Sequence, residues 1–296
     1  MDRYSIASDH LRAEVKAHGA ELCRLCTGSG VDLLWDGDPA VWGRQAPVLF
    51  PVVGALKDGR LLHQGRAYPM PRHGFARDLE FRMVLRTAHS CTLRLQDSDA
   101  TRAAYPFPFR LDLAFTVLGP ELKVQYALHN PGDTALPASF GAHPAFRWPL
   151  LPELAKQAHW LEFEKPEGDP LPALDAQGLL GGPPRPNPLL GRRLPLDDGL
   201  FSRDALLFLP AQSRAVCFSA PGGPALFVAW DGFPHLGVWS KPGARFLCIE
   251  PWRGYASPVG FDGEFAQKPG GFLVAPGATV TASYSVTVQL PAGRNP

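Results

Sequence analysis

The sequence predicts an all-β protein built from stacked antiparallel sheets, and three observations support this prediction. Apolar and polar residues alternate in many segments, which is the period of a half-buried strand. The chain holds 30 glycines and 32 prolines among 296 residues, which suits many short strands joined by turns. No segment shows a sustained apolar stripe at helical spacing with capping residues, so we expect only a few short helices.

The clearest strands lie in the middle and at the end of the chain. Residues 109–117 alternate, Gly119 and Pro120 turn the chain, and residues 122–128 alternate again, which predicts a hairpin with one dry face. Shorter or later strands are expected at residues 81–85, 91–95, 216–218, 226–230 and 280–288.

Three segments lack a strand pattern. Short helical turns are expected near Pro152 to Ala158 and Leu200 to Leu207. From Lys165 to Pro195 the chain is rich in Pro, Gly and Leu, which predicts a long irregular excursion over the surface. Linkers are usually more polar than this segment. Because strands are expected on both sides of it, we predict a single domain over residues 1–296.

Composition limits the classes of ligand and the cellular location. Lys and Arg number 29 against 28 for Asp and Glu, so the net charge of +1 gives no general reason to bind nucleic acid or an anionic membrane. The N-terminus lacks an apolar run, and no apolar stretch is long enough to span a bilayer. We therefore expect a cytoplasmic protein with a small-molecule ligand.

The five cysteines and the known catalytic motifs exclude further classes. An odd number of scattered cysteines fits reduced thiols, and Cys23-Arg24-Leu25-Cys26 has no second Cys or His pair for zinc. The segment from Gly54 to Arg60 lacks the Lys and Ser/Thr of a phosphate loop and is expected to be a turn. The absence of G-x-S-x-G, H-E-x-x-H and a complete G-x-G-x-x-G leaves serine hydrolases, zincins and dinucleotide-binding enzymes without support.

Two titratable residues precede prolines at the ends of apolar segments. His143 lies in Phe140-Gly141-Ala142-His143-Pro144, and Glu250 lies in Cys248-Ile249-Glu250-Pro251-Trp252. Proline disfavours helical backbone for the residue before it, so both side chains should sit on extended backbone with fixed directions. A held acid and a held base are the minimum requirement for proton-transfer chemistry.

A third polar segment combines two arginines and a histidine around a glycine. It runs Pro71-Arg72-His73-Gly74-Phe75-Ala76-Arg77-Asp78 in a loop between expected strands, and such loops often carry binding residues. Gly74 would let a ligand or a neighbouring strand come near. The alternative is that Arg77 pairs with Asp78 or Glu80 at the surface.

These motifs, in this order, resemble the aldose 1-epimerase or galactose-mutarotase-like family, and most closely its bacterial branch associated with lactose operons. The resemblance covers almost the whole chain. Its motifs are His73-Gly74-Phe75-Ala76-Arg77, Gly141-Ala142-His143-Pro144-Ala145-Phe146 and Ile249-Glu250-Pro251-Trp252, with further matches at residues 47–54, 204–206 and 233–240.

The resemblance implies a β-supersandwich with a sugar-binding cleft and interconversion of the α and β anomers of an aldose. Carried over by motif, Glu250 would be the general base on the anomeric hydroxyl and His143 the general acid for the ring oxygen. His73 and Arg77 would bind substrate oxygens, and Asp204 would hold hydroxyls from across the cleft. Such an acid and base pair needs no metal and no cofactor.

Three functions stay open on the sequence. The first is the free-sugar epimerase. The second is a hexose-6-phosphate 1-epimerase, for which Arg44, Lys57, Arg72 and Arg77 could bind the phosphate if they converge. The third is a carbohydrate-binding or sensing protein without turnover. A glycosidase has less support, because that chemistry usually needs two carboxylates.

The remaining histidines and two tryptophans give further expectations. His10, His18, His63, His89 and His159 are expected at the surface. Replacing His235 with Ala is expected to leave the rate nearly unchanged, and a loss as large as that of a His143 variant would show that His143 is the wrong acid. At least one ring of Trp239 and Trp252 is expected to line the cleft. Such a ring would bind the apolar face of a pyranose and would raise the pKa of Glu250 by lowering the local dielectric.

Overall fold

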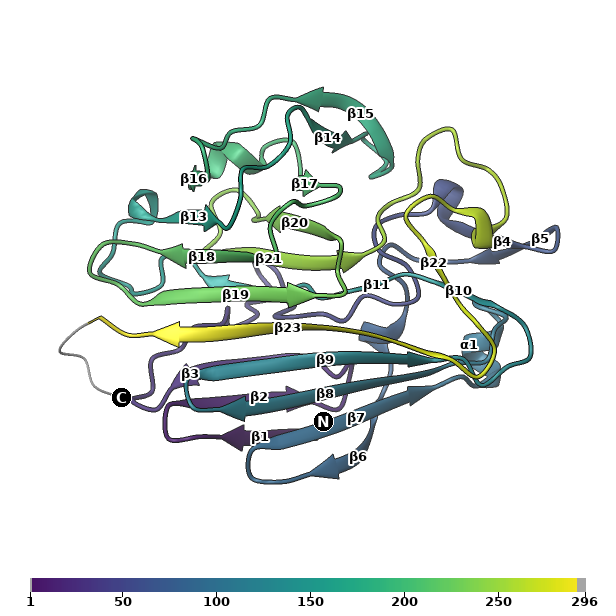
Figure 1. Ribbon diagram of the computed structural model, residues 1–296, viewed down its shortest axis with the longest axis horizontal. Helices are drawn as coiled ribbons and strands as arrows, with labels where there is room; N and C mark the ends of the chain where they lie inside the picture. Colours follow the sequence, from purple (N-terminus) through teal and green to yellow (C-terminus); the bar gives the residue numbers. More distant parts are fainter. Residues whose placement is uncertain (1, 292–296) are drawn as a thin grey trace.

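The computed structural model describes residues 2–291 and consists mainly of strands (Figure 1). The largest sheet has nine antiparallel strands: β6 (Arg82–Arg86), β7 (Ser90–Gln96), β8 (Arg110–Leu118), β9 (Glu121–His129), β13 (Trp160–Phe163), β16 (Arg193–Pro195), β18 (Ala215–Ser219), β19 (Ala225–Asp231) and β23 (Thr279–Gln289). Their order is β16-β13-β18-β19-β23-β9-β8-β7-β6. The all-β prediction is confirmed, and the predicted hairpin is β8 with β9.

A five-stranded sheet packs against one half of the large sheet. Its strands are β11 (Phe140–Gly141), β12 (Ala145–Arg147), β17 (Leu206–Phe208), β20 (His235–Trp239) and β21 (Phe246–Arg253). The order is β11-β21-β20-β17. β11 pairs with the end of β21, and β12 pairs with the beginning of the same strand. Alternate residues of β20 and β21 belong to the same buried apolar cluster as the inner faces of β18 and β19. Their other face is free to build a site.

Smaller sheets complete the fold. β1 (Arg3–Ala7), β2 (Leu11–Lys16) and β3 (Leu22–Thr27) form a sheet that lies beside β7, β8 and β9 (Figure 1). β4 (Arg60–His63) pairs with β5 (Arg66–Pro69), and β10 (Leu136–Ala138) pairs with β22 (Phe272–Val274). All five cysteines are free thiols, and Cys23 and Cys26 are buried on β3.

Helical structure is short throughout residues 2–291. The one α-helix in this range is α1 (Asp99–Arg102), and none there is long and apolar enough to cross a membrane. The remaining turns are 3₁₀ helices: η1 (Lys57–Gly59), η2 (Ala76–Asp78), η3 (Lys156–Ala158), η4 (Asp198–Phe201) and η5 (Phe265–Gln267). The turn expected over Leu200 to Leu207 is correct only at its start, because β17 begins at Leu206.

The structure corrects two further predictions. The segment from Lys165 to Pro195 is not irregular: β14 (Leu171–Leu174) and β15 (Leu180–Arg185) form a bulged hairpin, and β16 joins the large sheet. His159 is not at the surface, since it is 1 % exposed. Its Nε2 accepts a hydrogen bond from the Leu150 amide at 3.1 Å, so its polar atom is satisfied inside the protein.

Candidate active site

Glu250 lies in β21, and His143 lies in the loop between β11 and β12. Both of those strands pair with β21, so the loop passes directly over the strand that carries Glu250. The amide just before His143 donates to the carbonyl of Pro251 at 3.0 Å. The amide just before Glu250 donates to the carbonyl of Pro144 at 3.2 Å. The backbone around one residue is thus tied to the backbone around the other.

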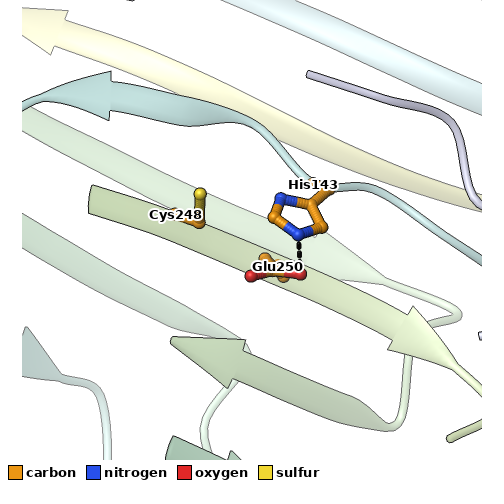
Figure 2. Close-up of side chains that lie close together, drawn as sticks. All are labelled: His143, Cys248 and Glu250. Carbon is orange, nitrogen blue, oxygen red and sulfur yellow. Dashed lines mark ion pairs between the residues drawn. The ribbon is translucent and has the colours of Figure 1, made fainter. Parts of the chain in front are cut away.

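The two side chains meet in a buried contact. Nε2 of His143 lies 3.1 Å from Oε2 of Glu250, as Figure 2 shows. His143 is 8 % exposed and Glu250 is 1 % exposed. Burial disfavours a charge on either group, so it lowers the pKa of His143 and raises the pKa of Glu250 well above its usual range. Both shifts favour a pair that shares one proton, with neither member charged.

Trp252 forms part of the cavity wall on the same face of β21 as Glu250. It is paired with Gly141 on β11, and Gly237 on β20 is paired with Glu250. A Cβ atom at Gly141 would lie 2.7 Å from Cδ1 of the indole, and one at Gly237 would lie 2.5 Å from its Cη2. The indole can lie flat across three strands only because both positions lack a side chain.

Two tryptophan rings lie against the imidazole of His143. The ring centroid of Trp42 lies 5.2 Å from that of His143 with an angle of 32° between the rings, and Trp239 lies 5.9 Å away edge-on. The main chain of Trp42 is held by a hydrogen bond from the indole of Trp35 to its carbonyl at 2.9 Å. Sequence reasoning missed Trp42, because its segment carries no strand or motif pattern.

The loop before η2 presents His73 with a defined tautomer. The backbone of His73 has a φ of 68°, and its amide donates to the Gly54 carbonyl at 2.9 Å. In return the Gly54 amide donates to Nδ1 of His73 at 3.1 Å. Burial keeps the pKa of His73 well below its usual range, so the ring is neutral. Since Nδ1 accepts, the proton is on Nε2, which is left as a donor.

Arg77 lies at the C-terminal side of the same loop. Its Nη2 donates to the Arg72 carbonyl at 2.8 Å, and its Nε lies 3.6 Å from Oδ2 of Asp78. The sequence left open whether Arg77 pairs with Asp78 or faces the site. The structure combines the two, because Arg77 also lines the cavity described below.

Asp204 stands on the opposite wall, just before β17. Its φ of 67° is in the left-handed region, which aspartate tolerates better than most residues. Nη2 of Arg72 donates to Oδ2 of Asp204 at 3.4 Å, which joins the two walls at the cavity. Arg185, from β15, donates to the carbonyl of Ala205 and holds this turn in place.

All six predicted site residues line one cavity of about 270 Å³: His73, Arg77, His143, Asp204, Glu250 and Trp252. Trp42, Arg72, Trp239 and Tyr255 line it as well, and Leu174, Leu180, Leu207 and Leu209 add an apolar wall. His235 instead lines a separate groove with Arg214 and Arg253. Arg44 is turned away, since it donates to the carbonyl of Arg77 at 3.1 Å.

Comparisons with known proteins agree on one family. The family model described as aldose 1-epimerase matches residues 2–285. The plasmid-encoded protein LacX of Lactococcus lactis is 30 % identical over 294 residues, covering 96 % of this chain and 98 % of that protein. A galactose mutarotase related enzyme from Lactobacillus acidophilus has a TM-score of 0.91 at 26 % identity, with both chains fully covered. A galactose mutarotase-like protein from Lactobacillus casei has a TM-score of 0.89 at 25 % identity, covering 97 % of this chain and 100 % of that one.

Proposed function

Because this chain belongs to the aldose 1-epimerase family, we propose that it is a mutarotase that interconverts the α and β anomers of an aldose. One observation carries the proposal. An imidazole nitrogen and a carboxylate oxygen, 3.1 Å apart, face a cavity of about 270 Å³ that also presents neutral and charged hydrogen-bonding groups. Ring opening of a pyranose needs one proton removed and one delivered at neighbouring oxygens, which is what such a pair can do.

In the proposed reaction, Glu250 takes the proton of the C1 hydroxyl while His143 gives a proton to the ring oxygen. The bond between C1 and the ring oxygen breaks, and an open-chain aldehyde forms. Rotation about C1–C2 exposes the other face of the carbonyl. The reverse transfers then close the ring as the other anomer and restore the starting protonation of both residues.

The number of protons on the pair is the same before and after ring opening, so the cycle needs no cofactor to supply or remove one. The working form is Glu250 carboxylate with His143 imidazolium. After ring opening, Glu250 holds the proton and His143 is neutral, which is the form that burial of both groups favours. The pair therefore passes between two forms with the same total number of protons, and no exchange with solvent is needed during turnover.

The other lining residues are proposed to hold the sugar. The Nε2–H of His73 would donate to a ring or hydroxyl oxygen, and Arg77 would donate to a second oxygen. Asp204 would accept from hydroxyl groups across the cavity. The indole of Trp252 would pack against the apolar C–H face of the ring, which leaves the hydroxyls free for these partners.

A sugar phosphate is the second candidate substrate, since Arg72 and Arg77 both line the cavity. Two observations weaken it. Arg72 is already paired with Asp204, and Arg44 is engaged by the carbonyl of Arg77. Lys57 lines a different pocket, beside Asp58 and Arg60, so the four cations considered from the sequence do not converge on one point.

The experiment is NMR exchange or polarimetry on fresh α-anomers, with free sugars and their 6-phosphates tested in parallel. We expect acceleration over the spontaneous rate with at least one free aldose. His143→Gln and Glu250→Gln should each lose about 10²- to 10⁴-fold in rate, whereas exposed His10→Gln should keep the full rate. Binding of a sugar, seen by tryptophan fluorescence, without any acceleration would instead support a non-catalytic binding protein.

A further inference from the structure

Cys248 lies beside the proposed acid and base and has no role in their chemistry. It precedes Glu250 by two residues on β21, so both side chains leave the same face of the strand. One ligand atom each from His143, Cys248 and Glu250 lie within 4.8 Å of one another, and all three residues are buried. In Figure 2 the sulfur and the imidazole stand on the same side of β21.

Two polar atoms of this trio make no hydrogen bond within the described part of the chain, although Oε2 of Glu250 still lies 3.1 Å from Nε2 of His143. Nδ1 of His143 and Oε2 of Glu250 are buried and make no hydrogen bond of ordinary geometry within residues 2–291. Burying a polar atom without a hydrogen bond costs free energy, and the free lone pair of such an atom can bind a cation. Within residues 2–291, no other three or more His, Cys, Asp or Glu side chains are grouped closely enough to bind a metal ion.

We propose that His143, Cys248 and Glu250 bind a thiophilic divalent ion such as Zn²⁺, and that this ion blocks the sugar site. Imidazole, thiolate and carboxylate are the ligand types that zinc takes in proteins. A tetrahedral ion with bonds of about 2.0 to 2.3 Å needs ligand atoms roughly 3.3 to 3.8 Å apart. The widest separation in the trio, at most 4.8 Å, would therefore have to shorten by up to about 1 Å when the ion binds.

Charge balance favours a divalent ion at this buried point. One thiolate and one carboxylate neutralise the two positive charges, and His143 binds as a neutral ligand. The thiol proton and the proton shared by the acid and base pass to solvent when the ion binds. An uncharged complex avoids the cost of a net charge in the interior.

The ion would enter through the sugar cavity and compete with the sugar. His143 and Glu250 line that cavity, whereas Cys248 is 0 % exposed behind them. With three protein ligands, the fourth position of the ion would face the cavity. Because the ion takes the groups that move protons, it would stop turnover. The inhibitory part of this inference rests on the proposed mutarotase function, but the binding part does not.

The first test measures binding directly with Cd²⁺ as the probe. The thiolate-to-metal absorption band in the ultraviolet is followed for the wild type, Cys248→Ala, Cys248→Ser and the matched control Cys91→Ala, another buried free thiol. We expect one equivalent bound with a band in the wild type and Cys91→Ala. The Cys248 variants should lose the band and bind at least about tenfold more weakly, which is the smallest change that one lost ligand should cause. An unchanged band in a Cys248 variant, or no band in the wild type, would overturn the proposal.

The second test measures inhibition of anomer exchange by Zn²⁺. Inhibition of the wild type should be competitive with the sugar, and Cys248→Ser should need at least about tenfold more Zn²⁺. Noncompetitive inhibition, or equal sensitivity of Cys248→Ser, would contradict the site. If the wild type turns over no sugar, the proposed function fails, and the Cd²⁺ band still decides whether the metal site exists.

Discussion

Burial gives His143 and Glu250 a proton content that two exposed groups of the same kinds would not have. An independent Glu and His, with pKa values near 4.5 and 6.5, are both charged only in the narrow range between those values. In this site burial moves the two pKa values past each other, because each charged form is disfavoured. The pair as a whole then carries one proton over a wide range of pH.

This argument predicts a broad plateau in the pH dependence of kcat/KM. Adding a second proton requires charging His143, so the acid limb should lie below pH 6.5. Removing the proton requires ionising Glu250, whose pKa is raised by burial, so the alkaline limb should lie well above pH 4.5. Steady-state rates from pH 4 to 9 test this. A narrow optimum near pH 5.5, midway between 4.5 and 6.5, would mean that the groups titrate independently.

Trp42 is the residue that the structure adds to this pair. Its indole lies against the imidazole at 5.2 Å, and an aromatic face attracts a cation by about 0.5 to 2 kcal/mol. It would therefore offset part of the cost of charging His143 during turnover.

Replacing Trp42 with Leu should lower kcat by about 2- to 30-fold, with KM nearly unchanged and the acid limb moved to lower pH. Trp42→Phe keeps an aromatic face and should retain most of the rate. Steady-state kinetics and an NMR titration of the His143 ring measure both effects. A rise in KM with no change in kcat or in the titration would assign Trp42 to sugar binding alone.

At this scale the sequence indicates the reactive groups better than their surroundings. The prolines after His143 and Glu250 mark both residues locally, and the family resemblance adds His73 and Arg77. Trp42 is 101 positions away from His143 and reaches it only through the fold. The burial that shifts the two pKa values likewise depends on layers that no local pattern describes.

Strand β21 is the element that assembles the site. Glycines on its two neighbouring strands make room for the indole of Trp252. Gly237 is paired with Glu250, and a Cβ there would lie 2.5 Å from Cη2 of Trp252. The pattern of alternating residues predicts strands in this region, but it does not say which strands lie side by side. The close approach of the indole to two glycines is therefore visible only in the assembled sheet.

Gly237→Ala should push the indole of Trp252 into the cavity. We expect KM to rise several-fold and the free energy of unfolding to fall by about 1 to 3 kcal/mol, the usual cost of overpacking. Gly168→Ala is the matched control, since a Cβ at Gly168 meets nothing within 4 Å. Kinetics and chemical denaturation of both variants give the comparison. Equal behaviour of the two variants would show that Trp252 yields without cost.

The hairpin of β14 and β15 shows where pattern reading fails at this scale. Its prolines and glycines hide the alternation, and its register shifts twice. Yet Leu174 and Leu180, at its two inner ends, line the cavity. A segment that the sequence presents as an irregular loop is thus part of the wall of the candidate site.

At the scale of the whole molecule, the sequence predicts the class of fold but not its sheet order. Strands β8, β9 and β23 are recognised because one face of each is buried and the other is wet. Their adjacency is not local: β23 inserts between β19 and β9, which are far apart in the chain. The same long-range pairing brings residues 54, 73, 143, 204 and 250 to one cavity.

The prediction of a single domain over residues 1–296 can be tested by unfolding, and the interleaving of the sheets gives the reason to expect it. The chain leaves the nine-stranded sheet after β9 to form β11 and β12, returns for β13, and leaves again for β17. One buried apolar cluster includes residues from Ile6 to Val288. Neither large sheet can therefore unfold while the other keeps its strands and its core.

We expect urea unfolding to give one transition, with the same midpoint by far-ultraviolet circular dichroism and by tryptophan fluorescence. A saturating sugar binds only the folded cavity, so it should raise both midpoints equally. Chains of this length often populate intermediates, which makes the coincidence of probes a demanding test. Two separated midpoints, with only the fluorescence transition shifted by the sugar, would show that the five-stranded sheet and its site fold as a unit of their own.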